Sequence, residues 1–116
     1  MPSGPFCNFD QPGVEPSEAT IANWWRQGHD GGAKGQYECI FAFIREDYTG
    51  DLKKISVPVL IMHGDADQIV PYATAAPRAV KLVKNRTLRK YQGFPHGMPT
   101  TRADTINADL LAFIES

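Results

Sequence analysis

An unbroken apolar run in the second half of the chain limits the folds that are open to it. The run is Val57-Pro58-Val59-Leu60-Ile61-Met62, which has the length of one strand and does not alternate between apolar and polar residues. Such a run is typical of a strand that is buried on both faces, as in a parallel sheet. We therefore expect a strand from Val57 to Met62.

The residues after this run complete a strand, helix, strand pattern. Apolar residues recur at helical spacing over residues 74–85, and residues 87–91 form a second short strand. The segment between the strands is long enough for the right-handed crossover that parallel strands require. Beyond it, Thr101-Arg102-Ala103-Asp104 has the form of a capping box, with Asp in place of Glu, and predicts a closing amphipathic helix. The fold class is therefore α/β, with a short parallel βαβ unit and a C-terminal helix.

The first half of the chain predicts a loop and two helices. Residues 1–16 are rich in Pro and Gly, which predicts a loop. Because two Phe residues lie among them, we expect this loop to be ordered. Ser17 is a candidate N-cap for a helix that ends near Gly28 and the Gly31-Gly32 pair, and a second helix runs from Gly35 to Asp47. Their apolar residues predict packing in the core, with the lining of an apolar substrate pocket as the alternative: Ile21, Trp24, Trp25, Tyr37, Ile40, Phe41 and Ile44.

Length, charge and cysteine content exclude several classes of protein. A chain of 116 residues with a formal net charge of −1 fits one domain without a basic patch for nucleic acid or anionic membrane. No apolar run is long enough to span a membrane, and no secretory signal precedes the domain, so we expect a cytoplasmic protein. Cys7 and Cys39 lack the spacing of a metal or redox site, and we expect two free, mostly buried thiols.

Residues able to carry chemistry follow both predicted strands. Asp67 lies in the loop after the first strand, and His96 lies in the loop after the second. Because parallel strands end at the same edge of a sheet, these side chains can meet there. An Asp that accepts a hydrogen bond from a His ring fixes the tautomer and stabilises the imidazolium. We therefore predict that Asp67 and His96 form the acid and base of a nucleophilic site.

Other interpretations of this loop stay open. Asp67 could instead form an Asx turn. We expect Asp65 to be a solvated turn residue, with the role of the catalytic acid as the alternative. His63 fits a structural histidine better than a catalyst. A calcium loop is disfavoured, because Ile69 and Val70 stand where a ligand and a Gly are needed. A magnesium-dependent phosphoryl transfer site would need further Lys and acidic residues, which the loop around His96 lacks.

Three motifs together resemble the C-terminal half of an α/β-hydrolase, above all the cofactor-free haloperoxidase group, also called perhydrolases or arylesterases. They are His63-Gly64-x-x-Asp67-x-x-Val70-Pro71, Pro95-His96-Gly97 and Asp109-Leu110-Leu111-Ala112-Phe113. The resemblance implies that Asp67 is the triad acid and His96 the triad base, in the chain order of that fold.

The resemblance extends upstream, where Ser3-Gly4-Pro5-Phe6 and the stretches around Trp24 and Tyr37 to Phe43 are similar to the family's helical cap. It implies that residues 1–54 are the second half of a hydrolase cap. Residues 55–116 would be the βαβα C-terminal half of the core, the two parts together forming one compact domain.

The family's nucleophile is missing from this sequence. The serine of the family lies in a G-x-S-x-G turn between a strand and a helix, and no such motif occurs here. None of the serines present follows a strand in that turn: Ser3, Ser17, Ser56 and Ser116. The resemblance thus implies a truncated serine hydrolase by descent, without cofactor or metal, whose full-length relatives act on small esters or carboxylic acids by hydrolysis or perhydrolysis.

The isolated chain is therefore expected to be inactive, because triad residues act as a unit. The alternative function is that of a non-catalytic module. Two strands with open edges are a template for pairing with another chain. We expect self-association, with a dimer favoured, or binding to a complementary N-terminal hydrolase half.

Overall fold

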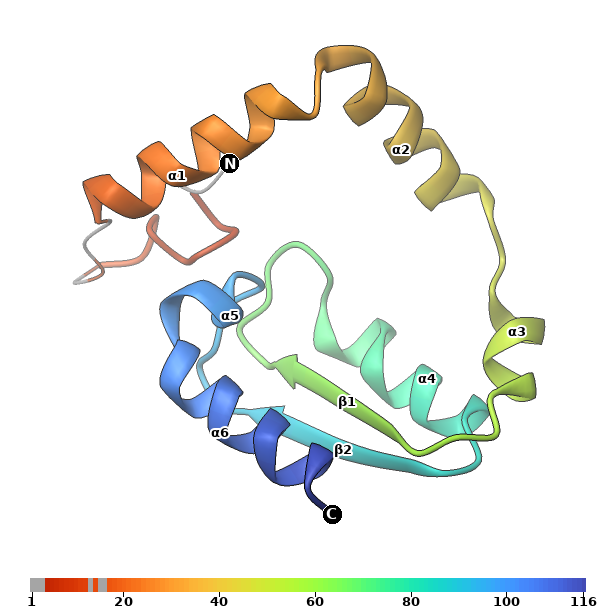
Figure 1. Ribbon diagram of the computed structural model, residues 1–116. Helices are drawn as coiled ribbons and strands as arrows, with labels where there is room; N and C mark the ends of the chain where they lie inside the picture. The colour runs from red at the N-terminus through yellow and green to blue at the C-terminus, as the bar shows by residue number, and fades with distance from the viewer. Residues whose placement is uncertain (1–3, 13, 15–16) are drawn as a thin grey trace.

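A two-stranded parallel sheet organises the second half of the computed structural model, which describes residues 4–12, 14 and 17–116 (Figure 1). Strand β1 (Val59–Gly64) pairs with β2 (Arg86–Tyr91) from Val59 opposite Arg86 to Gly64 opposite Tyr91. The expected parallel pair is confirmed. The first strand, however, begins two residues later than Val57, because Pro58 has no N–H to donate to a ladder. It also ends two residues beyond Met62, at Gly64.

The crossover between the strands consists of a short 3₁₀ helix, η1 (Tyr72–Thr74), and α4 (Ala76–Leu82). The helix was predicted, although α4 is shorter than the expected helix and ends three residues before Asn85. Figure 1 shows α4 and the closing helix α6 (Ala103–Ile114) on either side of the two strands. The short sheet is therefore covered by one helix from the crossover and one from the C-terminus.

The closing helix does not begin at a capping box. A short helix, α5 (Met98–Thr101), precedes α6, and Arg102 is the N-cap of α6 without a side-chain hydrogen bond. Thr101 is already helical, and its hydroxyl donates to the carbonyl of Gly97 at 3.3 Å. The capping-box prediction was wrong, because Thr101 belongs to the preceding helical turn.

The buried core lies between the sheet and the C-terminal helices. Its buried members are Tyr91, Met98 and Ile106, with Met62 and Phe94 packed against them. The hydroxyl of Tyr91 donates to Asp109 Oδ2 at 2.6 Å, which fastens β2 to α6. Burial, reinforced by this carboxylate, raises the pKa of Tyr91 to about 12.

The first half of the chain forms an arch of helices that stands away from the sheet (Figure 1). It comprises α1 (Glu18–Asp30), α2 (Ala33–Arg45) and the short α3 (Thr49–Lys54), which was not predicted. Ser17 is the N-cap of α1, as expected, and its hydroxyl accepts from the N–H of Thr20. The Cα radius of gyration is 15.8 Å, above the ~13 Å typical of a compact domain of this length.

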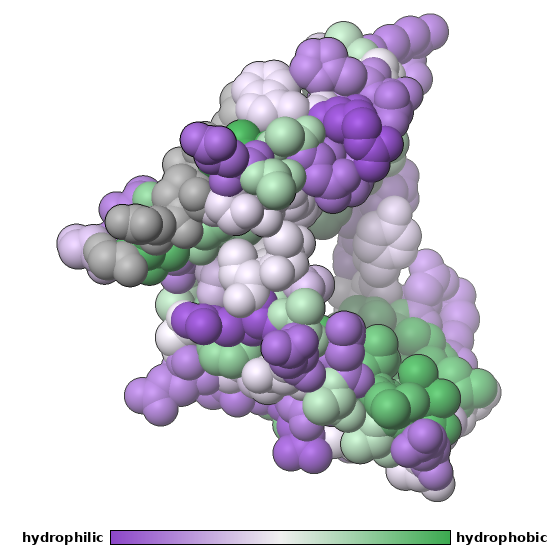
Figure 2. Space-filling model, turned by 60° about the vertical axis from the view of Figure 1, so that its left-hand side comes forward, coloured by the Kyte–Doolittle hydropathy of each residue, from purple (hydrophilic) through white to green (hydrophobic). Residues whose placement is uncertain are grey.

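The prediction that α1 and α2 pack into the core was wrong for this chain. Neither helix contains a buried residue, and Trp25, Ile40 and Ile44 are 55%, 59% and 65% exposed. Figure 2 shows further hydrophobic residues at the surface in the lower part of the molecule. Amphipathic spacing identifies an apolar face, but the described part of the chain places no second layer over these two helices.

The two cysteines differ in their burial. Both cysteines are free, but only Cys7 is buried, and Cys39 is exposed on α2. The expectation of two mostly buried thiols was therefore half wrong. No helix in the described part of the chain has the length and apolar character needed to cross a membrane.

Candidate active site

Asp67 and His96 meet at the ends of the two strands. Asp67 lies three residues beyond β1, and His96 lies five residues beyond β2. The distance from His96 Nδ1 to Asp67 Oδ2 is 2.8 Å. Since an ionised carboxylate can only accept, the Nδ1–H of His96 donates to it. The predicted proximity is confirmed.

The second oxygen of Asp67 closes an Asx turn. Asp67 Oδ1 accepts from the backbone N–H groups of Ile69 and Val70, at 2.9 and 2.8 Å. The Asx turn is therefore present, and it is compatible with the contact to His96 because each uses a different oxygen. The turn holds Oδ1 within its own loop, and Oδ2 lies toward His96.

The electrostatics of Asp67 favour its charged form. Burial by itself raises the pKa of this carboxyl, because the side chain is only 5% exposed. Hydrogen bonds from Val70, His96 and Ile69 outweigh burial and hold the pKa below its ordinary value. An anion held in this way can stabilise a positive charge on the neighbouring imidazole.

His63 is the last polar side chain of β1 and also reaches this carboxylate. Its Nε2 lies 3.0 Å from the carbonyl oxygen of Val70 and 3.2 Å from Asp67 Oδ2. Its ring packs edge-on against Tyr72, with the centroids 5.4 Å apart. The expectation of a structural histidine agrees with these contacts.

Asp65 ties the two loops together instead of pointing only into solvent. Its Oδ1 accepts from the N–H of Gly93 at 2.6 Å, and its Oδ2 lies 3.1 Å from Lys90 Nζ. The hydrogen bond from the Gly93 N–H, and to a lesser extent the hydrogen bond from Lys90, lower the pKa of the Asp65 carboxyl. Asp65 therefore has a structural role across the strand ends that the turn interpretation missed.

Residues 4–12, hereafter the N-terminal loop, contact the loop that carries His96. The N–H of Gly97 donates to the carbonyl of Phe6 at 2.6 Å. The Phe6 ring meets the His96 ring edge to face, with the centroids 4.8 Å apart, and meets Trp24 of α1 in the same manner at 4.8 Å. The aromatic content of this loop predicted that it is ordered, but nothing in the sequence indicated that it supports His96.

The same loop also contacts the turn that carries Asp67. Asn8 adopts a left-handed backbone conformation with φ of 57°, which Asn tolerates better than most residues. Its Oδ1 accepts from Gln68 Nε2 at 2.9 Å, and its Nδ2 donates to the carbonyl of Ala66 at 3.4 Å. The N-terminal loop thus holds both site loops at once.

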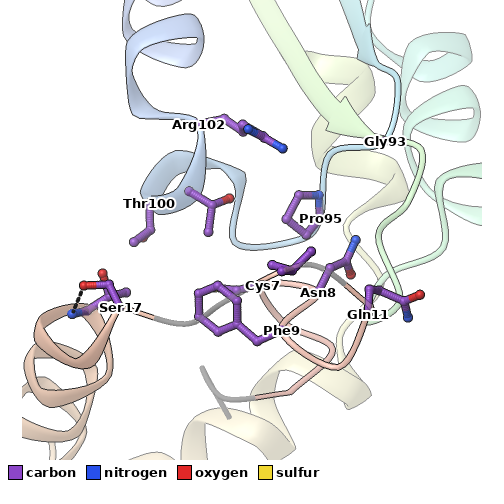
Figure 3. Close-up of a pocket in the computed structure, with 12 residues that line it drawn as sticks. Cys7, Asn8, Phe9, Gln11, Ser17, Gly93, Pro95, Thr100 and Arg102 are labelled. Atoms are coloured by element: carbon purple, nitrogen blue, oxygen red, sulfur yellow. Dashed lines mark hydrogen bonds between the residues drawn. The ribbon is translucent and has the colours of Figure 1, made fainter.

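A cavity of about 500 Å³ lies beside the site, between the N-terminal loop and the turn from α5 to α6. Figure 3 shows Cys7, Asn8 and Phe9 facing Pro95 and Arg102 across it. Neither Asp67 nor His96 lines this cavity. Within the described residues, no cluster of three or more His, Cys, Asp or Glu side chains is arranged to hold a metal ion.

No serine of the described chain reaches the acid and base. Ser17 caps α1, Ser116 donates to the carbonyl of Phe113, and Ser56 is exposed before β1. Ser3 lies outside the described residues. None of the three described serines forms a hydrogen bond with His96.

The known proteins that this chain resembles in sequence include an esterase/perhydrolase and a non-heme haloperoxidase. No family model matches the chain. It is 57% identical to a bifunctional esterase/perhydrolase of Acinetobacter calcoaceticus and 58% identical to a non-heme haloperoxidase of Rhodococcus erythropolis, covering 100% of this chain and 42% of each relative. The chain therefore spans less than half the length of these relatives.

A solved structure shares the fold. The crystal structure of a bromoperoxidase from Bacillus anthracis matches 97% of this chain and 41% of its own, with a TM-score of 0.87 and 30% identity. An esterase from Exiguobacterium antarcticum matches 88% of this chain with a TM-score of 0.77 and 24% identity, which supports the fold alone.

Proposed function

Because this chain corresponds in sequence and fold to the C-terminal part of an α/β-hydrolase of the non-heme haloperoxidase group, we propose that it carries the acid and base of a serine hydrolase. In this proposal Asp67 is the acid and His96 is the base. The observation that carries it is the 2.8 Å hydrogen bond between His96 Nδ1 and Asp67 Oδ2. No cofactor or metal is required for this chemistry.

The hydrogen bond determines which nitrogen of His96 can act. With its proton on Nδ1 and directed at Asp67, the imidazole presents a lone pair on Nε2. Nε2 takes the proton of a serine hydroxyl as that oxygen attacks the carbonyl carbon of an ester, and it then gives the proton to the departing alcohol. The same nitrogen deprotonates the molecule that next attacks the acyl-serine. Water yields a carboxylic acid, and hydrogen peroxide yields a peracid.

The nucleophile has to come from residues that this sequence does not contain. The sequence has no G-x-S-x-G motif, and loss of a triad nucleophile costs on the order of 10⁶ in rate. We therefore propose that the chain by itself turns over esters negligibly. The complete reaction requires a segment that supplies the serine elbow and its oxyanion hole.

A second candidate function is that of a self-associating module. The exposed apolar residues of α2, which include Tyr37, Ile40 and Ile44, form the kind of surface through which proteins often associate. A two-fold pair is the commonest closed arrangement that would cover them. A complementary N-terminal hydrolase half is the other partner that we propose.

A hybrid enzyme tests the proposed acid and base. This chain replaces the matching 42% of the Acinetobacter esterase/perhydrolase, and hydrolysis of p-nitrophenyl acetate is measured. We expect activity in the hybrid and its loss in the variant His96→Gln. The matched control is His29→Gln, because His29 is an exposed histidine of α1. Full activity in His96→Gln would contradict the proposal, and peracid formation with acetate and hydrogen peroxide would separate perhydrolysis from hydrolysis.

A further inference from the structure

The carboxylate of Asp67 is held at both of its oxygens. Oδ1 accepts the two backbone N–H groups of its own turn, from Ile69 and Val70. Oδ2 lies within reach of two imidazoles, 2.8 Å from His96 Nδ1 and 3.2 Å from His63 Nε2. Only the first of these imidazoles has a role in the proposed reaction.

The position of one proton on His63 follows from its second neighbour. Nε2 lies 3.0 Å from the carbonyl oxygen of Val70, and a carbonyl oxygen can only accept a hydrogen bond. Nε2 of His63 must therefore carry a proton. The same N–H is shared between the Val70 carbonyl and Asp67 Oδ2, so His63 acts as a donor toward the carboxylate.

A second anchor matters because one oxygen alone does not fix the orientation of a carboxylate. With only Oδ1 bound, the group can turn about its Cβ–Cγ bond and carry Oδ2 away from His96. The donor on His63 opposes this turn from a rigid position, because His63 is part of β1 and its ring packs against Tyr72. The side chain of His63 is 13% exposed, so water competes little for the bond.

We propose that His63 is a positioning residue that holds Asp67 Oδ2 in place for the Nδ1–H of His96. The inference rests on the proposed function, because it matters for catalysis only if Asp67 and His96 are the acid and base. His63 acts through Asp67 and does not touch the reacting atoms. Its consequence is that His96 keeps one tautomer, with Nε2 free to accept a proton.

Nitrogen NMR of the ring nitrogens tests this in the full chain without any assay of activity. The chain has three histidines, His29, His63 and His96, so single substitutions assign every signal. The spectra are recorded at mildly alkaline pH. We expect His63 as the single Nε2–H tautomer and His96 as the single Nδ1–H tautomer.

Three variants separate positioning from general damage to the fold. His63→Leu removes the donor, and we expect the two nitrogen shifts of His96 to converge as its tautomers interconvert. His63→Gln keeps an N–H near the position of Nε2, and we expect it to restore the single Nδ1–H form of His96. His29→Gln is the control and should leave the signals of His63 and His96 unchanged.

Each outcome decides the proposal. An unchanged His96 pattern in a folded His63→Leu variant would overturn the role of His63 and leave the proposed function standing. If His63→Leu does not fold, the spectrum of the unsubstituted chain decides, because an Nδ1–H tautomer of His63 would overturn the proposal. His96 as the Nε2–H tautomer in the unsubstituted chain would overturn both the inference and the proposed acid and base.

Discussion

His96 Nδ1 lies 2.8 Å from Asp67 Oδ2, although 29 positions separate the two residues in the sequence. The parallel pair brings them together, because the register ends with Gly64 opposite Tyr91 and both loops then leave the sheet at the same edge. The N-terminal loop secures the contact through Asn8 on one side and Phe6 on the other. The site thus depends on segments from three parts of the chain.

Gly97→Ala should destabilise the fold. A Cβ at Gly97 would lie 2.5 Å from the sulfur of Cys7 and 3.0 Å from the carbonyl oxygen of Phe6, and such overpacking costs about 1–3 kcal/mol. Chemical denaturation measures the change in the free energy of unfolding. Gly50→Ala is the control, since nothing lies within 4 Å of a Cβ there. Equal stability of the two variants would show that the N-terminal loop does not pack on Gly97.

Removing the hydroxyl of Tyr91 should change the alkaline limit of stability. Its pKa is raised to about 12 in the fold, so the protonated phenol contributes stability that is fully present below the ordinary pKa of about 10. This contribution is lost as the pH rises from about 10 through about 12. The free energy of unfolding measured over this range should fall steeply for the unsubstituted chain and less steeply for Tyr91→Phe. Parallel curves would contradict the account.

The acid limit should depend on Asp67. Its pKa is lowered in the fold, so the ionised carboxylate contributes stability that is fully present above the ordinary pKa of about 3.9. That contribution is lost as the pH falls through the lowered value. Asp67→Asn should lower stability at neutral pH by about 1–3 kcal/mol and flatten the acid decline. Asp30→Asn, at the exposed end of α1, should leave the shape of the decline unchanged.

The isolated chain should associate with itself. The exposed residues Ile40 and Ile44 lie on one face of α2, so Ile40→Ser with Ile44→Ser should weaken association. Light scattering at micromolar concentration gives the mass. A single species near 12.8 kDa at all concentrations would show that the unsubstituted chain does not pair.

The two cysteines should differ in reactivity toward a thiol reagent. Cys39 is exposed on α2 and should react in the native state. Cys7 is 2% exposed, and burial raises the pKa of its thiol, so it should react only after unfolding. Counting modified thiols with and without denaturant measures this. Two fast-reacting thiols in the native chain would contradict the packing of Cys7 against Gly97.

The sequence predicted those features that depend on neighbouring residues or on strand order. The run around Leu60 predicted a strand, and the rule that parallel strands end at one edge predicted the contact of Asp67 with His96. The expected burial of that strand on both faces was wrong, because residues 59–63 are only half-buried. The strand begins at Val59 and not at Val57, because Pro58 has no N–H for strand pairing. A prediction from hydropathy does not detect this missing donor.

Features that depend on distant segments could not be predicted in the same way. The hydrogen bonds of Asn8 with Gln68 and Ala66 join residues 60 and 58 positions apart, and no local pattern encodes them. The apolar spacing on α2 showed which side of the helix is hydrophobic, but it could not show whether another layer covers Ile40 or Ile44.

The central claim is that Asp67 acts on His96 in ester chemistry, and the Asp67→Asn variant tests it most directly. In the hybrid with the Acinetobacter relative, kcat for p-nitrophenyl acetate is compared between the unsubstituted hybrid and its Asp67→Asn variant, with Asp30→Asn as the control. An amide at this position can donate to His96 Nδ1 and so favours the wrong tautomer, which costs a serine triad about 10⁴ in kcat. The account predicts a loss of that order in a folded Asp67→Asn hybrid, whereas a kcat within a few-fold of the unsubstituted hybrid would contradict it.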